Sequence, residues 1–124
     1  MRRLAVPLVA LSLLAFTGAA AGSRSGPPAI PTIPGNWSHA EINVKINRAP
    51  HTLILDRGRI TQASDGQVTL RELGTATTIP LSADTIIVFR GVSIDGSQLR
   101  RGLYAETMRI DGGAAVRVRE TLRP

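Results

Sequence analysis

Few residues of the chain are equipped for covalent catalysis. Cysteine is absent, and histidine occurs only at His39 and His51. Nucleophilic catalysis needs a nucleophile, a base and a group that orients the base. Serines are present, but none lies in a Gly-x-Ser-x-Gly sequence. The composition excludes a cysteine enzyme and disfavours a serine hydrolase, so we assign no catalytic residue and predict that the protein is not an enzyme.

One set of side chains could bind a metal ion: His39, Glu41 and His51. Alternate positions of a strand share a face, so His39 and Glu41 would lie together, and imidazole and carboxylate are both zinc ligands. His51 would join them if the two strands paired. The spacing is not repeated elsewhere, and we therefore predict no metal and no other cofactor. A small metal-dependent or hydrolytic enzyme built on these three residues is the alternative.

Arg109, Arg117 and Arg119 are the candidate binding residues. Arg117 and Arg119 are two positions apart in an alternating segment, so they share a face, and Arg109 precedes them across Asp111-Gly112-Gly113. If the two segments pair as a hairpin, the three guanidinium groups lie near one another. Guanidinium binds phosphate or carboxylate in a fork. The set predicts contact with an anionic group, and ordinary outward-facing strand charge is the alternative.

Aromatic side chains are sparse, which bears on the choice of ligand. Beyond residue 21 the chain has only Trp37, Phe89 and Tyr104. Sites for single-stranded nucleic acid use aromatic side chains as stacking platforms. We therefore expect no nucleic-acid partner.

Residues 1–21 have the pattern of a secretory signal peptide. A basic start, Met1-Arg2-Arg3, is followed by the apolar stretch Leu4–Phe16 and by the small residues of an Ala19-x-Ala21 cleavage sequence. The apolar stretch is too short to cross a bilayer, which takes about 20 residues. We expect cleavage after Ala21, with an uncleaved anchor as the alternative. The protein is then exported, either secreted or periplasmic at the cell envelope, with no transmembrane segment after cleavage.

Two further regions follow the leader. Residues 22–36 are rich in Pro, Gly and Ser, and they predict a flexible linker because proline removes amide donors and favours extended conformations. Residues 37–124 are long enough for one modest core and predict a single β domain. Cysteine is absent, so this core would not be secured by disulfides. The formal charge of +6 falls to +4 when Arg2 and Arg3 are removed, a mild excess that favours anionic surfaces.

Alternation of polar and apolar residues marks the strands. The run Thr85–Phe89 is rich in branched side chains and predicts a central strand buried on both sides. Ile42, Val44 and Ile46 occupy one face of a half-buried strand at residues 41–46, before a turn at residues 47–50. Apolar positions change parity across Gly58, which predicts a bulge or sharp bend there.

Turns and one short helical segment complete the pattern. Asp111-Gly112-Gly113 predicts a hairpin turn between two strands. Ser97–Arg101 predicts a helical turn, with Ser97 as its N-cap and Gly102 as its stop. The whole is typical of an all-β domain of six or seven short strands. We expect a small antiparallel, partly closed barrel, similar to an oligonucleotide/oligosaccharide-binding fold, with an open two-layer sandwich as the alternative.

Five segments follow one another in residues 52–121: Gly58-Arg59-Ile60, Ser64-Asp65-Gly66, Val68-Thr69-Leu70, Ile79-Pro80-Leu81 with Thr85-Ile86, and Gln98–Leu103. In their order these segments resemble a family of short bacterial β-rich domains, domain of unknown function 5666. The resemblance implies an exported or envelope-associated bacterial protein with a small barrel. It implies no reaction and no catalytic residues.

The predicted function is that of an exported, non-catalytic β-domain. It would be a binding or interaction module at the bacterial cell envelope, with an envelope protein or an anionic polymer as its partner. Besides the enzyme built on His39, Glu41 and His51, a purely structural domain of an envelope assembly is an alternative. No oligomeric state follows from the sequence.

Overall fold

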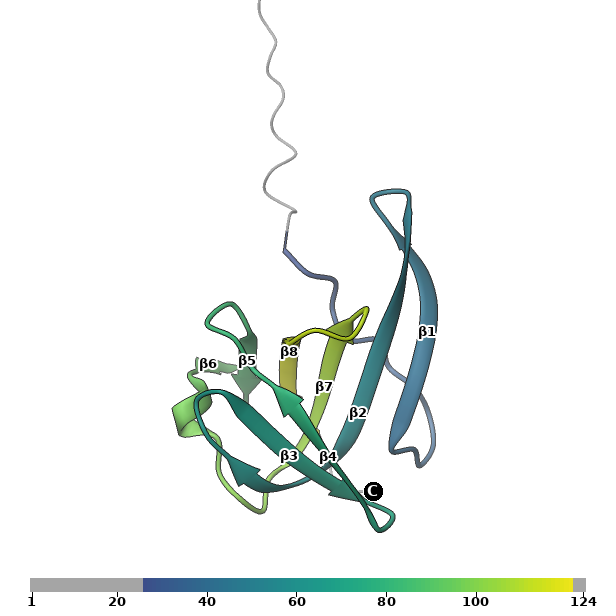
Figure 1. The fold of residues 1–124 in the computed structure, drawn as a ribbon. Coiled ribbons are helices and arrows are strands. Elements are labelled where there is room, and N and C mark those ends of the chain that lie inside the picture. Colours follow the sequence, from purple (N-terminus) through teal and green to yellow (C-terminus); the bar gives the residue numbers. More distant parts are fainter. Residues whose placement is uncertain (1–25, 122–124) are drawn as a thin grey trace, which may run out of the picture.

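A computed structural model of the chain describes residues 26–121, so the predicted leader lies outside the described residues. Within that range the protein is all-β, as predicted, and it contains no α-helix (Figure 1). The eight strands are β1 His39–Ile46, β2 Ala49–Ala63, β3 Gln67–Glu72, β4 Thr75–Pro80, β5 Ile86–Phe89, β6 Val92–Ile94, β7 Tyr104–Ile110 and β8 Ala115–Glu120.

All the described strands belong to one sheet with open ends. Its hydrogen-bonded order is β4-β3-β2-β7-β8-β5-β6, and β1 pairs with β2. Every pair is antiparallel except β5 with β8, which is parallel. The ladder does not close into a barrel, so the open sheet of the alternative is nearer to what is observed. One reason is local: β4 ends at Pro80, which has no amide to donate, and the chain leaves the ladder before β5 begins.

The organising strand is β2, and the prediction that Thr85–Phe89 is central was wrong. β2 pairs along one edge with β1 and then β3, and along its other edge with β7. β5 is only four residues long and lies next to last in the sheet. Ile87 and Phe89 are buried, but Ile86 and Val88 are only half-buried. The apolar run therefore correctly indicated a strand but not its place in the sheet.

β2 buries opposite faces in its two halves, which explains the change of parity. Leu53 and Leu55 pack on one face, whereas Asp56, Gly58 and Ile60 turn to the other. The expected bulge is not at Gly58: the register against β3 shifts between Ile60 and Gln62. Gly58 is required for another reason, because a Cβ atom there would lie 2.8 Å from the carbonyl oxygen of Arg71.

Two hydrophobic cores lie on the two faces of the sheet. The larger core draws on six of the strands and on Leu81 and Leu99. Its buried members are Ile60, Val68, Leu70, Ile79, Leu81, Ile87, Phe89, Leu99, Ala105, Ala115 and Val118. The smaller core consists of Ile30, Leu53, Leu55 and Met108, surrounded by half-buried apolar side chains. Because apolar side chains lie on both faces, a further segment must cover the face that carries the smaller core.

Residues 26–37, which we call the strap, supply that cover. The strap contains the described part of the predicted linker, and it does not behave as a free arm: Ile30 is only 5% exposed and packs in the smaller core. Ile33 and Trp37 pack against the same core. Figure 1 shows the strap passing behind the sheet before the chain enters β1. The prolines predicted an extended, flexible segment. The side chains of Ile30, Ile33 and Trp37 instead attach the strap to the sheet.

The turns match the prediction more closely than the helical segment does. Asn47 and Arg48 form the two-residue turn of the β1–β2 hairpin, with φ values of 52° and 70°. The short helical turn is a 3-10 helix at Gly96–Gln98, not at Ser97–Arg101. Asp95 is its N-cap, because the Asp95 carbonyl accepts from the Gln98 amide at 2.9 Å; the Asp95 amide in turn donates to Gln98 Oε1 at 2.9 Å. No helix in residues 26–121 is long and apolar enough to span a membrane.

Candidate functional site

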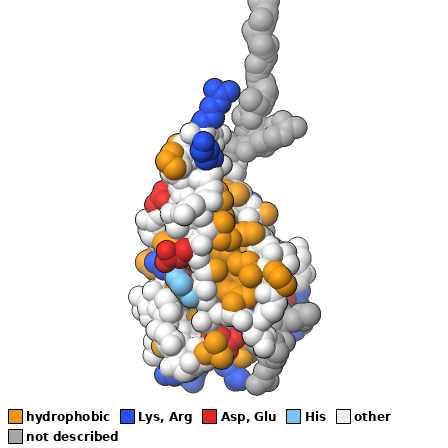
Figure 2. Space-filling model, turned by 90° about the vertical axis from the view of Figure 1, so that its right-hand side faces the viewer, with side chains coloured by type: hydrophobic (Ala, Val, Ile, Leu, Met, Phe, Trp, Pro, Cys, Tyr) orange, Lys and Arg blue, Asp and Glu red, His pale blue; other side chains and the backbone are white. Residues whose placement is uncertain are grey.

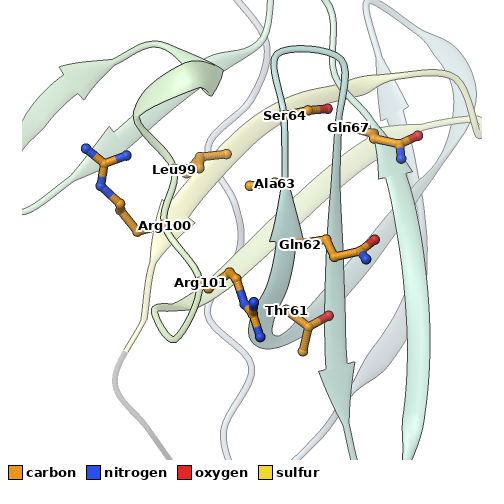
Figure 3. A pocket seen from close by; sticks show the side chains of 8 residues that line it. All are labelled: Thr61, Gln62, Ala63, Ser64, Gln67, Leu99, Arg100 and Arg101. Atoms are coloured by element: carbon orange, nitrogen blue, oxygen red, sulfur yellow. The ribbon is translucent and has the colours of Figure 1, made fainter.

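A groove of about 730 Å³ lies where β2 ends, between the β2–β3 hairpin and the loop that leads into β7 (Figure 3). We call it the arginine groove. Its lining residues come from two stretches of chain far apart in the sequence: Thr61, Gln62, Ala63, Ser64, Gln67, Leu99, Arg100 and Arg101. Two of these residues, Arg100 and Arg101, are consecutive in the chain and cationic.

The hairpin wall of the groove is shaped by the bulge. Thr61 is the extra residue between Ile60 and Gln62, and its hydroxyl donates to the Thr69 carbonyl at 3.4 Å. Bulges redirect the side chains that follow them. The hairpin then closes tightly, because the Ser64 amide donates to the Gln67 carbonyl at 2.9 Å. This arrangement places hydroxyl and amide side chains along one side of the groove.

The loop wall is fixed to β2 by both backbone and side-chain contacts. The Gly102 amide donates to the Ile60 carbonyl at 2.8 Å, and the Ile60 amide donates to the Leu103 carbonyl at 2.8 Å. Leu99 is buried in the larger core. Arg100 and Arg101 are exposed between these anchors. Figure 3 shows Arg101 directed toward the β2 wall and Arg100 directed away from it.

The groove is suited to an anionic, hydroxyl-rich ligand. Its lining includes Arg100 and Arg101, of which Arg101 points toward the β2 wall, and no carboxylate, together with the amides of Gln62 and Gln67 and two hydroxyl groups. Guanidinium groups bind carboxylate or phosphate through paired N–H donors, and amides and hydroxyls serve sugar hydroxyls. No aromatic side chain lines the groove, so ring stacking is not available there.

The predicted arginine set is divided between the two faces of the sheet. Arg117 donates through Nε to the Pro28 carbonyl and through Nη2 to the Pro27 carbonyl, both at 2.8 Å. Arg119 donates to Glu106 Oε1 at 2.7 Å. Arg109 lies on the opposite face and reaches Asp56 Oδ2 at 3.4 Å. Their role in binding a partner stays a prediction, but Arg117 and Arg119 hold the strap.

His39 is held between two carboxylates. Its Nδ1 lies 2.8 Å from Asp56 Oδ1, and its Nε2 lies 3.0 Å from Glu41 Oε2. Asp56 is only 3% exposed. These contacts raise the pKa of His39 above its usual value, chiefly through the hydrogen bond with Asp56 and then that with Glu41, against an opposing effect of burial. His39 and Asp56 line a cavity of about 300 Å³ together with Ser38 and Arg57.

His51 lies too far from His39 to share a ligand with it. In the β1–β2 register His39 faces Asp56, whereas His51 faces Val44, five residues further along β1. At about 3.4 Å per residue the two are roughly 17 Å apart along the strand. The two-residue turn at Asn47 and Arg48 imposes this register. Residues 26–121 contain no group of three or more His, Asp or Glu residues arranged to hold a metal ion.

His51 instead fastens the β7–β8 turn to β2. Its Nδ1 lies 2.6 Å from Asp111 Oδ2, and the Thr52 amide donates to Asp111 Oδ1 at 2.8 Å. These contacts lower the pKa of Asp111, the Thr52 amide first and His51 second. Asp111 therefore lies in the β7–β8 turn, as predicted, and its carboxylate also connects this turn to β2.

Sequence reasoning missed the arginine groove. Arg100 and Arg101 entered the predictions only as part of the helical turn Ser97–Arg101 and of the segment that resembles domain of unknown function 5666. The available signal was two consecutive arginines between an apolar residue and Gly102. That pattern is typical of an anchored loop with an exposed tip, but nothing local indicates that β2 bulges opposite it.

No protein-family model matches the chain, and no curated protein or solved structure matches it significantly. The resemblance of residues 52–121 to domain of unknown function 5666 therefore stays a prediction.

Proposed function

We propose that the protein is an exported, non-catalytic β-domain that binds an anionic polymer of the bacterial cell envelope in the arginine groove. The observation that carries the proposal is the pairing of Arg100 and Arg101 with amide and hydroxyl side chains in one hollow without a carboxylate. A polymer of carboxylate or phosphate groups linked to hydroxylated units supplies the matching chemistry.

Rigidity of the groove supports a binding role. Both walls are tied to Ile60, because this residue exchanges backbone hydrogen bonds with the Gly102–Leu103 segment and pairs with Leu70 of β3. Binding sites on rigid elements lose less conformational entropy when the ligand arrives. A groove built in this way can bind repeated units of a polymer without a change in the fold.

Export and a barrel-like fold are the other parts of the proposal. The signal-peptide pattern of residues 1–21 supports export. A small, partly closed barrel is supported by the larger core, to which Ile79 of β4 and Ile87 of β5 both contribute although β4 and β5 do not pair with each other. The order of motifs shared with domain of unknown function 5666 agrees with both.

A binding assay with matched variants tests the proposal. Purified protein is titrated with polygalacturonate, which carries carboxylates, with inorganic polyphosphate, and with neutral dextran as the control polymer. The double variant Arg100→Ala/Arg101→Ala should bind the preferred anionic polymer about tenfold or more weakly, because two charge-assisted contacts are lost. The affinity of the wild type should fall as salt is raised.

The control variant is Arg71→Ala/Arg90→Ala, which removes the same charge from exposed positions outside the groove. It should retain the wild-type affinity. Equal losses in the two double variants would reduce the effect to net charge and contradict the groove. Absence of binding to both anionic polymers by the wild type would contradict the proposed ligand class.

The enzyme alternative stays a second proposal, although His51 faces Val44 and so does not lie beside His39 in the β1–β2 pair. The other alternative, a structural domain of an assembly, does not require the groove to bind a ligand. It predicts that Arg100→Ala/Arg101→Ala leaves every polymer affinity unchanged.

A further inference from the structure

The outer edge of β1 is free. Among the described strands β1 has one ladder partner, β2, and the two pair without a register shift over all eight residues of β1. Long, regular edge strands invite pairing with another strand, and proteins usually block them with bulges, prolines or several charges. β1 has no proline, no bulge and a single lysine.

The backbone groups that face outward can be identified from the register. The Arg57 amide donates to the Ser38 carbonyl at 2.9 Å, so the backbone groups of Ser38 face β2. Because successive residues of a strand point their backbone groups to opposite sides, Ala40, Ile42, Val44 and Ile46 also face β2. The amides and carbonyls of His39, Glu41, Asn43 and Lys45 therefore face the free edge.

We propose that two copies of the chain pair antiparallel through these edges, about a two-fold axis at Asn43. In this register the outward groups of Asn43 meet those of the second copy's Asn43, and Glu41 faces Lys45 of the second copy. The two-fold axis produces the opposite-charge pair twice. A symmetric interface of this kind uses one patch on both subunits.

The charges select this register over its neighbours. A shift by two residues in one direction sets Glu41 opposite Asn43 and His39 opposite Lys45, which removes both opposite-charge pairs. A shift in the other direction sets Asn43 opposite Lys45. Both Glu41 and Lys45 are exposed, and Lys45 has no ion-pair partner within residues 26–121. Opposite charges placed directly across an antiparallel ladder are stabilising.

The apolar side of β1 supports the same partner. Ala40, Ile42, Val44 and Ile46 are only half-buried and border the smaller core. Figure 2, which views the molecule from the β1 side, shows hydrophobic side chains gathered in a band across this face. In the proposed register Ile42 faces Val44 of the second copy, so each copy extends the apolar cover of the other.

This inference does not depend on the proposed ligand. β1 pairs with residues 49–56 of β2, whereas the arginine groove begins at Thr61, so the groove stays open in the pair. If the groove binds a polymer, two linked grooves raise the overall affinity through the effective concentration of the second site.

Charge reversal tests the pairing. The mass of the purified protein is measured by sedimentation equilibrium across a concentration series. The wild type should approach twice the monomer mass at the higher concentrations. Lys45→Glu sets two glutamates opposite each other at two places, and Glu41→Lys does the same with lysines. Each should weaken the dimer Kd by about tenfold or more. The double variant Glu41→Lys/Lys45→Glu restores both pairs and should restore dimerisation.

Hydrogen exchange adds a readout at single residues. The amides of Glu41, Asn43 and Lys45 should gain protection as the concentration rises, whereas those of Ile42 and Val44 should be protected at every concentration because they face β2. The exposed positions of residues 41 and 45 keep the variants folded, which circular dichroism checks. A wild type that stays monomeric throughout, or a double variant no better than the single ones, would overturn the proposal.

Discussion

The buried charges show how the two faces of the sheet are held. Asp56 and Arg57 are neighbours in β2, but they point to opposite faces. On one face Asp56 contacts His39 and Arg109. On the other, Glu106 lies 3.8 Å from Arg57 Nε and bonds Arg119. Buried ions are tolerated when they are paired, and loss of one partner leaves the other uncompensated.

His39 should titrate above its usual value of 6.5. Because the folded pKa is raised, the stability that His39 contributes is fully present below the unfolded pKa and is lost as pH rises through the folded pKa. Glu41→Gln should lower the pKa of His39, and Asp56→Asn should lower it more, since Asp56 is the larger cause. Nuclear magnetic resonance of the imidazole measures this directly. A His39 pKa at or below 6.5 in the wild type would contradict the contacts.

At the scale of the element, β2 determines the shape of the sheet. This strand of 15 residues pairs along one edge first with β1 and then with β3. Its first half packs side chains into the smaller core, and its second half packs them into the larger core. The backbone of β3 lies close to Gly58, where a Cβ atom would also lie 2.9 Å from the carbonyl carbon of Arg71. A backbone neighbour cannot move aside as a side chain can. The crossing of β2 and β3 therefore depends on the absence of a side chain.

Gly58→Ala should reduce the free energy of unfolding by about 1–3 kcal/mol, the usual cost of forcing extra atoms into a packed interior. Gly66→Ala is the matched control, because a Cβ atom at Gly66 has nothing within 4 Å and the residue is in a turn with no positive φ. Urea unfolding of the two variants gives the comparison. Equal stability of the two variants would mean that β3 does not lie against Gly58.

At the scale of the whole molecule, the strap completes the second core. Four arginine contacts reach its backbone carbonyls: Arg117 to Pro27 and to Pro28, Arg119 to Ile30, and Arg57 to Gly35. The Arg57 guanidinium also lies 5.3 Å from the centre of the Trp37 ring. A proline-rich segment has few amide donors but keeps all its carbonyls, so arginine is a suitable partner for it.

Ile30→Ala should lower the free energy of unfolding by about 2 kcal/mol or more, because a buried isoleucine side chain is lost from a small core. Val92→Ala is the control, since Val92 is 59% exposed and its loss should cost little. Denaturant unfolding of the two variants, each prepared as residues 22–124, measures both free energies of unfolding. An Ile30→Ala variant as stable as the control would show that the strap does not contribute to the fold.

Local signals predicted the parts of the fold that depend on neighbouring residues. The alternation of Ile42, Val44 and Ile46 indicated a half-buried strand, and Asp111-Gly112-Gly113 indicated a hairpin turn. The prediction for Gly58 recognised an unusual place in β2, but the bulge lies further along, between Ile60 and Gln62. Parity can change because a residue is inserted or because a strand exchanges the face it buries, and only the partners of the strand distinguish the two.

By itself, the sequence determined the all-β class and the position of most turns, because strand periodicity and turn chemistry are encoded within a few residues. Tertiary structure alone decided that β2 is central and that Arg117 and Arg119 hold the strap. It also decided that His39 and His51 lie apart and that Arg101 points toward the bulged end of β2. The physical reason is register: which side chains meet depends on the pairing of segments distant in the chain, and a local pattern carries no information about that pairing.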